Sequence, residues 1–95
     1  MDSSITKRHH VIISGRVQGV GFRAYTKKKA DSLGLAGWVK NIMHGRVEAV
    51  YEGDEASVYA MTAWCQQGPS FARVEKLEMK EEPISDIFSD FRILY

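Results

Sequence analysis

Three glycines stand within nine residues, between an apolar run at 11–13 and a segment of helical periodicity that starts near Phe22. The stretch from Gly15 to Arg23 reads G-R-V-Q-G-V-G-F-R. Glycine permits positive φ angles and lets the backbone approach a ligand closely, because it has no Cβ. The stretch therefore predicts a strand, a tight loop and the start of a helix in direct succession, which restricts the chain to folds that contain this unit.

The predicted loop has the properties of an anion site. Backbone amides of a loop and a first helical turn can converge on one group, and the helix dipole adds positive charge there. Arg23 falls in that turn, and its guanidinium can bind an oxyanion through two hydrogen bonds. The glycine spacing matches neither the dinucleotide fingerprint nor the nucleotide P-loop. An ordinary strand-to-helix turn with a surface arginine also explains the glycines, so this stretch alone leaves both readings open.

The remaining elements follow from the periodicity of apolar residues. The predicted strands are 10–17, 35–41, 46–52, 71–81 and 91–95, and the predicted helices are 22–33 and 55–67. A break in the alternation between Val74 and Leu77 predicts a β-bulge near 75–76. The order β-α-β-β-α-β with a short C-terminal edge strand predicts a ferredoxin-like α+β sandwich, with an antiparallel sheet and two helices on one face.

Length and composition limit the class of protein. The 95 residues suffice for one domain, so we predict a single domain over 1–95 with a flexible polar tail at residues 1–8. No apolar run can span a bilayer, and the first ten residues lack a secretory apolar segment, so no membrane partner is expected. The single cysteine, Cys65, excludes an internal disulfide and favours a cytoplasmic location. A formal net charge of +1 argues against a nucleic-acid partner, and a monomer suffices.

Asn41 is a polar residue that continues the apolar face of the predicted strand 35–41. A turn-initiating asparagine is common at a strand end. An amide directed at a binding site would instead supply a hydrogen-bond donor and an acceptor together. The spacing favours neither interpretation. Cys65, on the apolar stripe of the second predicted helix, is interpreted as a core residue and not as a nucleophile.

Two stretches together resemble the signature motifs of acylphosphatases. The first is the glycine-rich stretch from Gly15 to Arg23. The second is G-W-V-K-N from Gly37 to Asn41, followed by glycines at 45 and 53. The predicted order of elements also fits that family over nearly the whole chain, as do the Gly-Pro pair at 68–69 and the ending 91–95. Some members carry a cysteine where this chain has Gly21.

The resemblance implies hydrolysis of acyl phosphates to a carboxylate and inorganic phosphate, without a metal ion or cofactor. It implies that Arg23 and the loop amides bind the phosphate and that Asn41 orients the attacking water. The loop amides in question are those of Val17, Gln18, Gly19, Val20, Gly21 and Phe22. The expected partners are a small-molecule acyl phosphate and inorganic phosphate.

Two other functions fit the same fold. The domain could bind a phosphorylated ligand without turnover; related domains occur as parts of large hydrogenase-maturation proteins that handle carbamoyl phosphate. A pure binder would need Arg23 but not Asn41. RNA binding would need stacking aromatic residues on the central strands and a basic surface. The first predicted strand offers Val11, Ile12 and Ile13 instead, which argues against RNA binding. The two matching motifs and the presence of Asn41 favour the enzyme over a pure binder.

Overall fold

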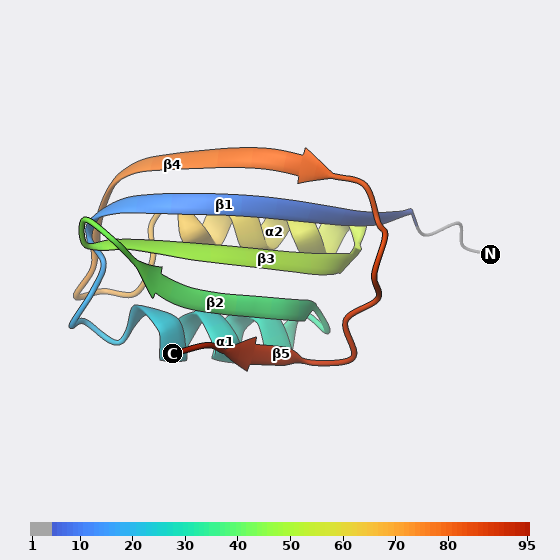
Figure 1. Ribbon diagram of the computed structural model, residues 1–95, viewed down its shortest axis with the longest axis horizontal. Coiled ribbons are helices and arrows are strands. Elements are labelled where there is room, and N and C mark those ends of the chain that lie inside the picture. Colours follow the sequence, from blue (N-terminus) through green and yellow to red (C-terminus); the bar gives the residue numbers. More distant parts are fainter. Residues whose placement is uncertain (1–4) are drawn as a thin grey trace.

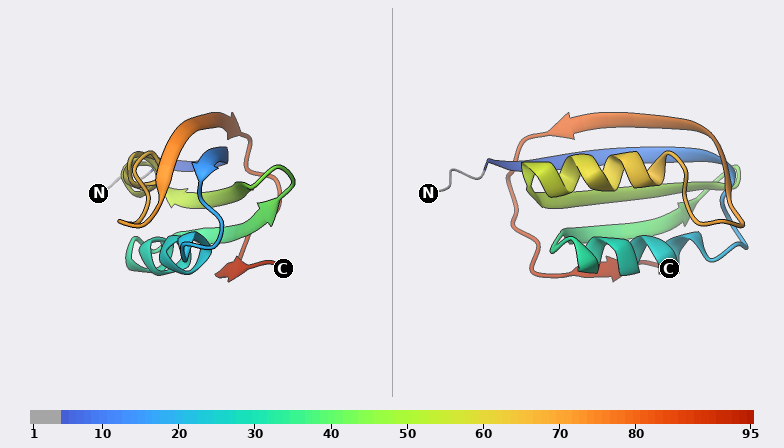
Figure 2. Two further views of the ribbon diagram at one scale, coloured as in Figure 1. Left: turned by 90° about the vertical axis from the view of Figure 1, so that its left-hand side faces the viewer. Right: turned by 180° about the vertical axis from the view of Figure 1, so that it is seen from behind.

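The computed structural model describes residues 5–95 as one five-stranded sheet with two helices packed on one of its faces (Figures 1 and 2). The elements in chain order are β1 (Thr6–Arg16), α1 (Phe22–Ser32), β2 (Ala36–Ile42), β3 (Arg46–Asp54), α2 (Glu55–Cys65), β4 (Arg73–Glu82) and β5 (Phe91–Ile93). The predicted ferredoxin-like α+β sandwich, with its short C-terminal edge strand, is confirmed. No helix in this range is long and apolar enough to cross a membrane.

The strand order β4-β1-β3-β2-β5 sets which chain segments meet. Because β3 is antiparallel to both β1 and β2, the latter two run in the same direction and end on one side of the fold. The loop after β1 and the hairpin after β2 lie together there, at the left of Figure 1. β5 pairs with β2 in parallel, so the sheet is mixed and the prediction of a wholly antiparallel sheet is wrong at this edge.

Each helix buries one stripe against the sheet. The buried helix residues are Phe22, Thr26 and Ala30 in α1, and Val58, Met61 and Cys65 in α2. Burial raises the pKa of the Cys65 thiol to about 12, so this group remains protonated and fits its interpretation as a core residue. The predicted bulge is present as well, because Ser14 pairs with Lys76 whereas Gly15 pairs with Val74.

The start of β1 differs from the prediction. Residues 6–8 were expected in a flexible tail, but they pair with β3, and the Arg8 side chain is buried. Its Nε donates to Oε1 of Glu52 over 2.8 Å, and its guanidinium carbon lies 4.8 Å from the ring centroid of Phe88. Phe88 belongs to the segment 83–90 that joins β4 to β5, so contacts distant in the sequence hold this polar start in place. In the rest of the predicted tail, the carbonyl oxygen of Ile5 accepts a hydrogen bond from the amide of Glu55, and residues 1–4 lie outside the described residues.

His9 is a buried histidine on the helix-covered face of β1. Its side chain is 1 % exposed, and its Nδ1 lies 2.7 Å from Oγ1 of Thr62 in α2. Its Nε2 is buried without a hydrogen-bond partner among the described residues. Burial lowers the pKa of His9 below its ordinary value of 6.5, because a charged imidazole would lose its hydration there. The folded protein therefore favours the neutral ring.

This burial predicts a loss of stability in acid. Below the ordinary histidine pKa the unfolded chain binds a proton that folded His9 resists, so the free energy of unfolding should fall as the pH drops from 6.5 through the lower folded pKa. One such group contributes at most about 1.4 kcal/mol per pH unit. Urea unfolding of His9→Gln between pH 7.5 and 5 should show a shallower pH dependence than the parent. His44→Gln, at an exposed loop position, is the control and should leave the slope unchanged; an unchanged slope in His9→Gln would contradict the account.

Candidate active site

The loop between β1 and α1 is fixed at both ends by buried side chains. Val17 is 1 % exposed at its start and Phe22 is 2 % exposed at its end, where the Phe22 ring centroid lies 5.8 Å from that of Trp64. Between them Gly19 and Gly21 have φ angles of 75° and 78°. Gly21 is the N-cap of α1, so the loop leads directly into the positive end of the helix dipole.

The loop, the first turn of α1, the end of β2 and the C-terminal residues enclose a cavity of about 170 Å³. Its lining comprises Val17, Gln18, Gly19, Gly21, Phe22, Arg23, Ala24, Asn41, Ile93 and Tyr95. Arg23 and Asn41, 18 residues apart in the sequence, thus lie at one cavity because β1 and β2 end on the same side of the sheet.

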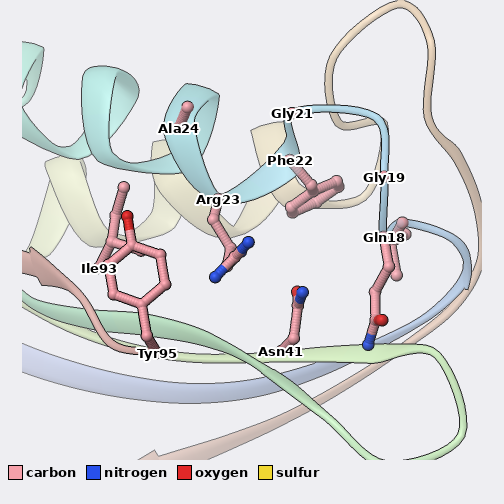
Figure 3. Close-up of a pocket in the computed structure, with 10 residues that line it drawn as sticks. Gln18, Gly19, Gly21, Phe22, Arg23, Ala24, Asn41, Ile93 and Tyr95 are labelled. Carbon is pink, nitrogen blue, oxygen red and sulfur yellow. The ribbon is translucent and has the colours of Figure 1, made fainter.

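The side chains of Arg23 and Asn41 point toward each other across this cavity (Figure 3). Arg23 is half-buried, and its guanidinium carbon lies 5.1 Å from the ring centroid of Tyr95. None of the ion pairs within residues 5–95 includes Arg23. Its positive charge therefore faces the cavity without a carboxylate that would compete with an anion.

The structure brings most of the predicted site residues to this cavity. Five of the six residues whose amides were implicated line it. Val20 is absent from the lining, and its side chain packs against the hydrophobic core. Ile93 and Tyr95 were not predicted at the site. They reach it because β5 lies beside β2, and the alternation of residues 91–95 does not reveal that pairing. The strand predicted over 91–95 is also shorter than expected, because β5 ends at Ile93.

The backbone of Gly19 leads to a prediction about the loop. Its φ of 75° is one that β-branched residues rarely adopt, although a Cβ added there would meet no atom within 4 Å. Gly19→Val should therefore lower kcat/KM for an acyl phosphate, by about 10- to 100-fold, through a change in loop backbone and not through crowding. Gly19→Asn is the matched control, because asparagine tolerates positive φ, and should retain most activity. Steady-state kinetics with both variants tests this, and equal losses would contradict it.

Comparisons with known proteins identify the family of the chain. The family model "Acylphosphatase" matches residues 9–93. The chain belongs to the acylphosphatase family. An acylphosphatase from Methylococcus capsulatus is 51% identical over 88 residues, which are 93% of this chain and 96% of the relative. An acylphosphatase structure from Coxiella burnetii matches with a TM-score of 0.90 and 42% identity over 99% of this chain and 100% of that one.

The same fold also occurs within a larger protein. The structure of full-length HypF in its phosphate- and nucleotide-bound form matches with a TM-score of 0.88 and 26% identity, over 99% of this chain but only 12% of that one. The Methylococcus and Coxiella relatives, in contrast, match along nearly their whole length. The chain is accordingly an enzyme that hydrolyses acyl phosphates.

Proposed function

We propose that the enzyme holds the phosphoryl group of an acyl phosphate with Arg23 and the amides of residues 17–22, while Asn41 orients a water molecule for in-line attack on phosphorus. The observation that carries this proposal is the convergence of the Arg23 guanidinium and the Asn41 amide on one cavity at the start of α1 (Figure 3). A dianionic group in that cavity would meet a guanidinium, a helix N-terminus and two glycines in the left-handed region.

Hydrolysis of an acyl phosphate requires the protein to orient the reactants and to stabilise the charge of the phosphoryl group. In the proposed step the water oxygen bonds to phosphorus, the bond from phosphorus to the acyl oxygen breaks, and its electron pair leaves with the carboxylate. A carboxylate is a good leaving group, so no general acid is needed. Arg23 and the amides stabilise the charge on the phosphoryl oxygens, a contribution that grows in a preorganised site.

In this proposal Asn41 orients the attacking water but does not act as its general base. Its amide oxygen can accept a hydrogen bond from the water and hold a lone pair toward phosphorus. An amide is too weakly basic to remove the proton, so in this proposal a phosphoryl oxygen of the substrate takes it. The pH–rate profile of kcat should therefore show no essential enzyme base near neutrality. A bell-shaped profile that persists with several acyl phosphates would contradict this step.

The proposal extends to a cytoplasmic monomer that needs no metal ion or cofactor. The roles proposed for Arg23, Asn41 and the loop amides are all filled by residues of one chain, so the proposed mechanism needs no second subunit. The single cysteine of the sequence is buried in the core, in keeping with a protein that does not depend on disulfides. The expected substrate is a small-molecule acyl phosphate, in keeping with the family of the chain.

Hydrolysis of benzoyl phosphate in the presence of a chelator tests the proposed function. We expect rapid turnover that the chelator does not change and that inorganic phosphate inhibits competitively, because phosphate would occupy the same cavity as the substrate. Saturable phosphate binding without turnover would instead support the alternative of a phosphate-binding module. Turnover that the chelator abolishes would contradict the metal-free mechanism.

A further inference from the structure

The side chain of Gln18 connects the phosphate loop to the hairpin that carries Asn41. Its Nε2 donates to the carbonyl oxygen of Ile42 over 3.0 Å and to that of Arg46 over 2.8 Å. Ile42 and Arg46 are paired across β2 and β3 and close the hairpin loop 43–45. One amide group thus joins the loop before α1 to both strands at the base of the hairpin.

These contacts define what the Gln18 side chain can do. The amide nitrogen has two hydrogens, and both are used by the two carbonyl groups, so the nitrogen has none left for a substrate oxygen. The pairing of β1 with β3 ends at Ile13 and Val47. Beyond that point, Gln18 makes the only side-chain hydrogen bonds within residues 5–95 that join the loop 17–21 to the hairpin.

Asn41 depends on such external support. Asn41 directly precedes Ile42 and is exposed. Among the described residues, no hydrogen bond holds its side chain in place. Its position relative to the phosphate loop is therefore set by the backbone of the hairpin. That backbone is held against the loop at the Ile42 carbonyl, one residue away from the Asn41 side chain.

We propose that Gln18 is a positioning residue, which acts through Asn41 by fixing the distance between the bound phosphoryl group and the attacking water. This inference rests on the proposed roles of Arg23 and Asn41. Arg23 and the loop amides remain in place without the Gln18 side chain, so binding of phosphate should be little affected. The water would be misplaced, and a displacement of about 1 Å costs on the order of 10²-fold in rate.

Gln18→Met tests the proposal, because methionine has a similar length but no hydrogen-bond donor. We expect kcat for benzoyl phosphate to fall by about 10- to 100-fold, while the inhibition constant for phosphate changes by less than about 3-fold. Gln18→Asn, which keeps the amide but is one methylene too short to reach both carbonyls, is a second variant in case the first does not fold. Gln66→Met, at an exposed position after α2, is the matched control and should leave kcat unchanged.

A double-mutant cycle separates positioning from a general structural effect. If Gln18 acts through Asn41, its substitution should have almost no further effect on kcat in the Asn41→Ala background. The same fold loss in both backgrounds would overturn the proposal, as would a parallel loss of phosphate affinity and kcat in Gln18→Met. An Asn41→Ala enzyme with full activity would instead overturn the proposed function of Asn41, and this inference with it.

Discussion

Arg23→Ala should lower kcat/KM for benzoyl phosphate by about 10³- to 10⁵-fold, the range found when an arginine that stabilises a transferring phosphoryl group is removed. Arg23 has no ion-pair partner among the described residues, so its loss leaves no buried carboxylate unpaired. Its guanidinium lies at the cavity and against an exposed tyrosine ring, outside the core. The free energy of unfolding should therefore stay within about 1 kcal/mol of the parent value.

The binding of phosphate gives a second readout for Arg23. Arg23→Ala should lose competitive inhibition by inorganic phosphate together with turnover, whereas Arg23→Lys should retain part of both. Lysine keeps the positive charge but lacks the planar pair of donors. Arg73→Ala, at an exposed residue at the start of β4, is the control and should behave like the parent. Phosphate inhibition that survives in Arg23→Ala would show that the loop amides alone hold the anion.

Asn41→Ala is expected to separate turnover from binding. Without the amide the water is no longer oriented, and kcat should fall by at least about 10²-fold. Arg23 and the loop are unchanged, so the inhibition constant for phosphate should remain close to that of the parent. Measurement of kcat and of this constant on the same preparation checks both parts of the prediction.

The comparison of substitutions at Asn41 defines its chemical role. Asn41→Asp keeps the shape and an acceptor oxygen but places a negative charge at the phosphate site, so it should weaken phosphate binding. His44→Ala, three residues along on the same hairpin and exposed, is the control and should leave kcat unchanged. Near-full activity of Asn41→Ala would exclude the water-orienting role.

The elements that carry the site could be predicted from the sequence because their signals are local. The glycines at 19 and 21 mark a loop with positive φ, and Phe22, Thr26 and Ala30 recur at the helical period. The phase break in the fourth strand revealed a one-residue bulge, which the pairing of Ser14 and Gly15 with β4 confirms. Each of these features depends on residues that are neighbours in the chain.

The features that the sequence did not reveal depend on residues far apart in the chain. Arg8 is buried only because Glu52 and Phe88 are brought against it, and the sequence pattern of residues 6–8 is that of a polar tail. Tyr95 reaches the cavity through the parallel pairing of β5 with β2. Nothing in the alternation of a strand indicates which strand it will pair with, or in which direction.

Hydrolysis of benzoyl phosphate in ¹⁸O-labelled water tests the central claim, attack of water on phosphorus, most directly. Attack at phosphorus places the solvent oxygen in inorganic phosphate and leaves the benzoate unlabelled. Mass spectrometry of both products after one enzymatic hydrolysis in excess label distinguishes the two sites of attack. We predict one ¹⁸O atom in each phosphate molecule and none in benzoate, whereas label in benzoate would show attack at the carbonyl carbon and contradict the roles proposed for Arg23 and Asn41.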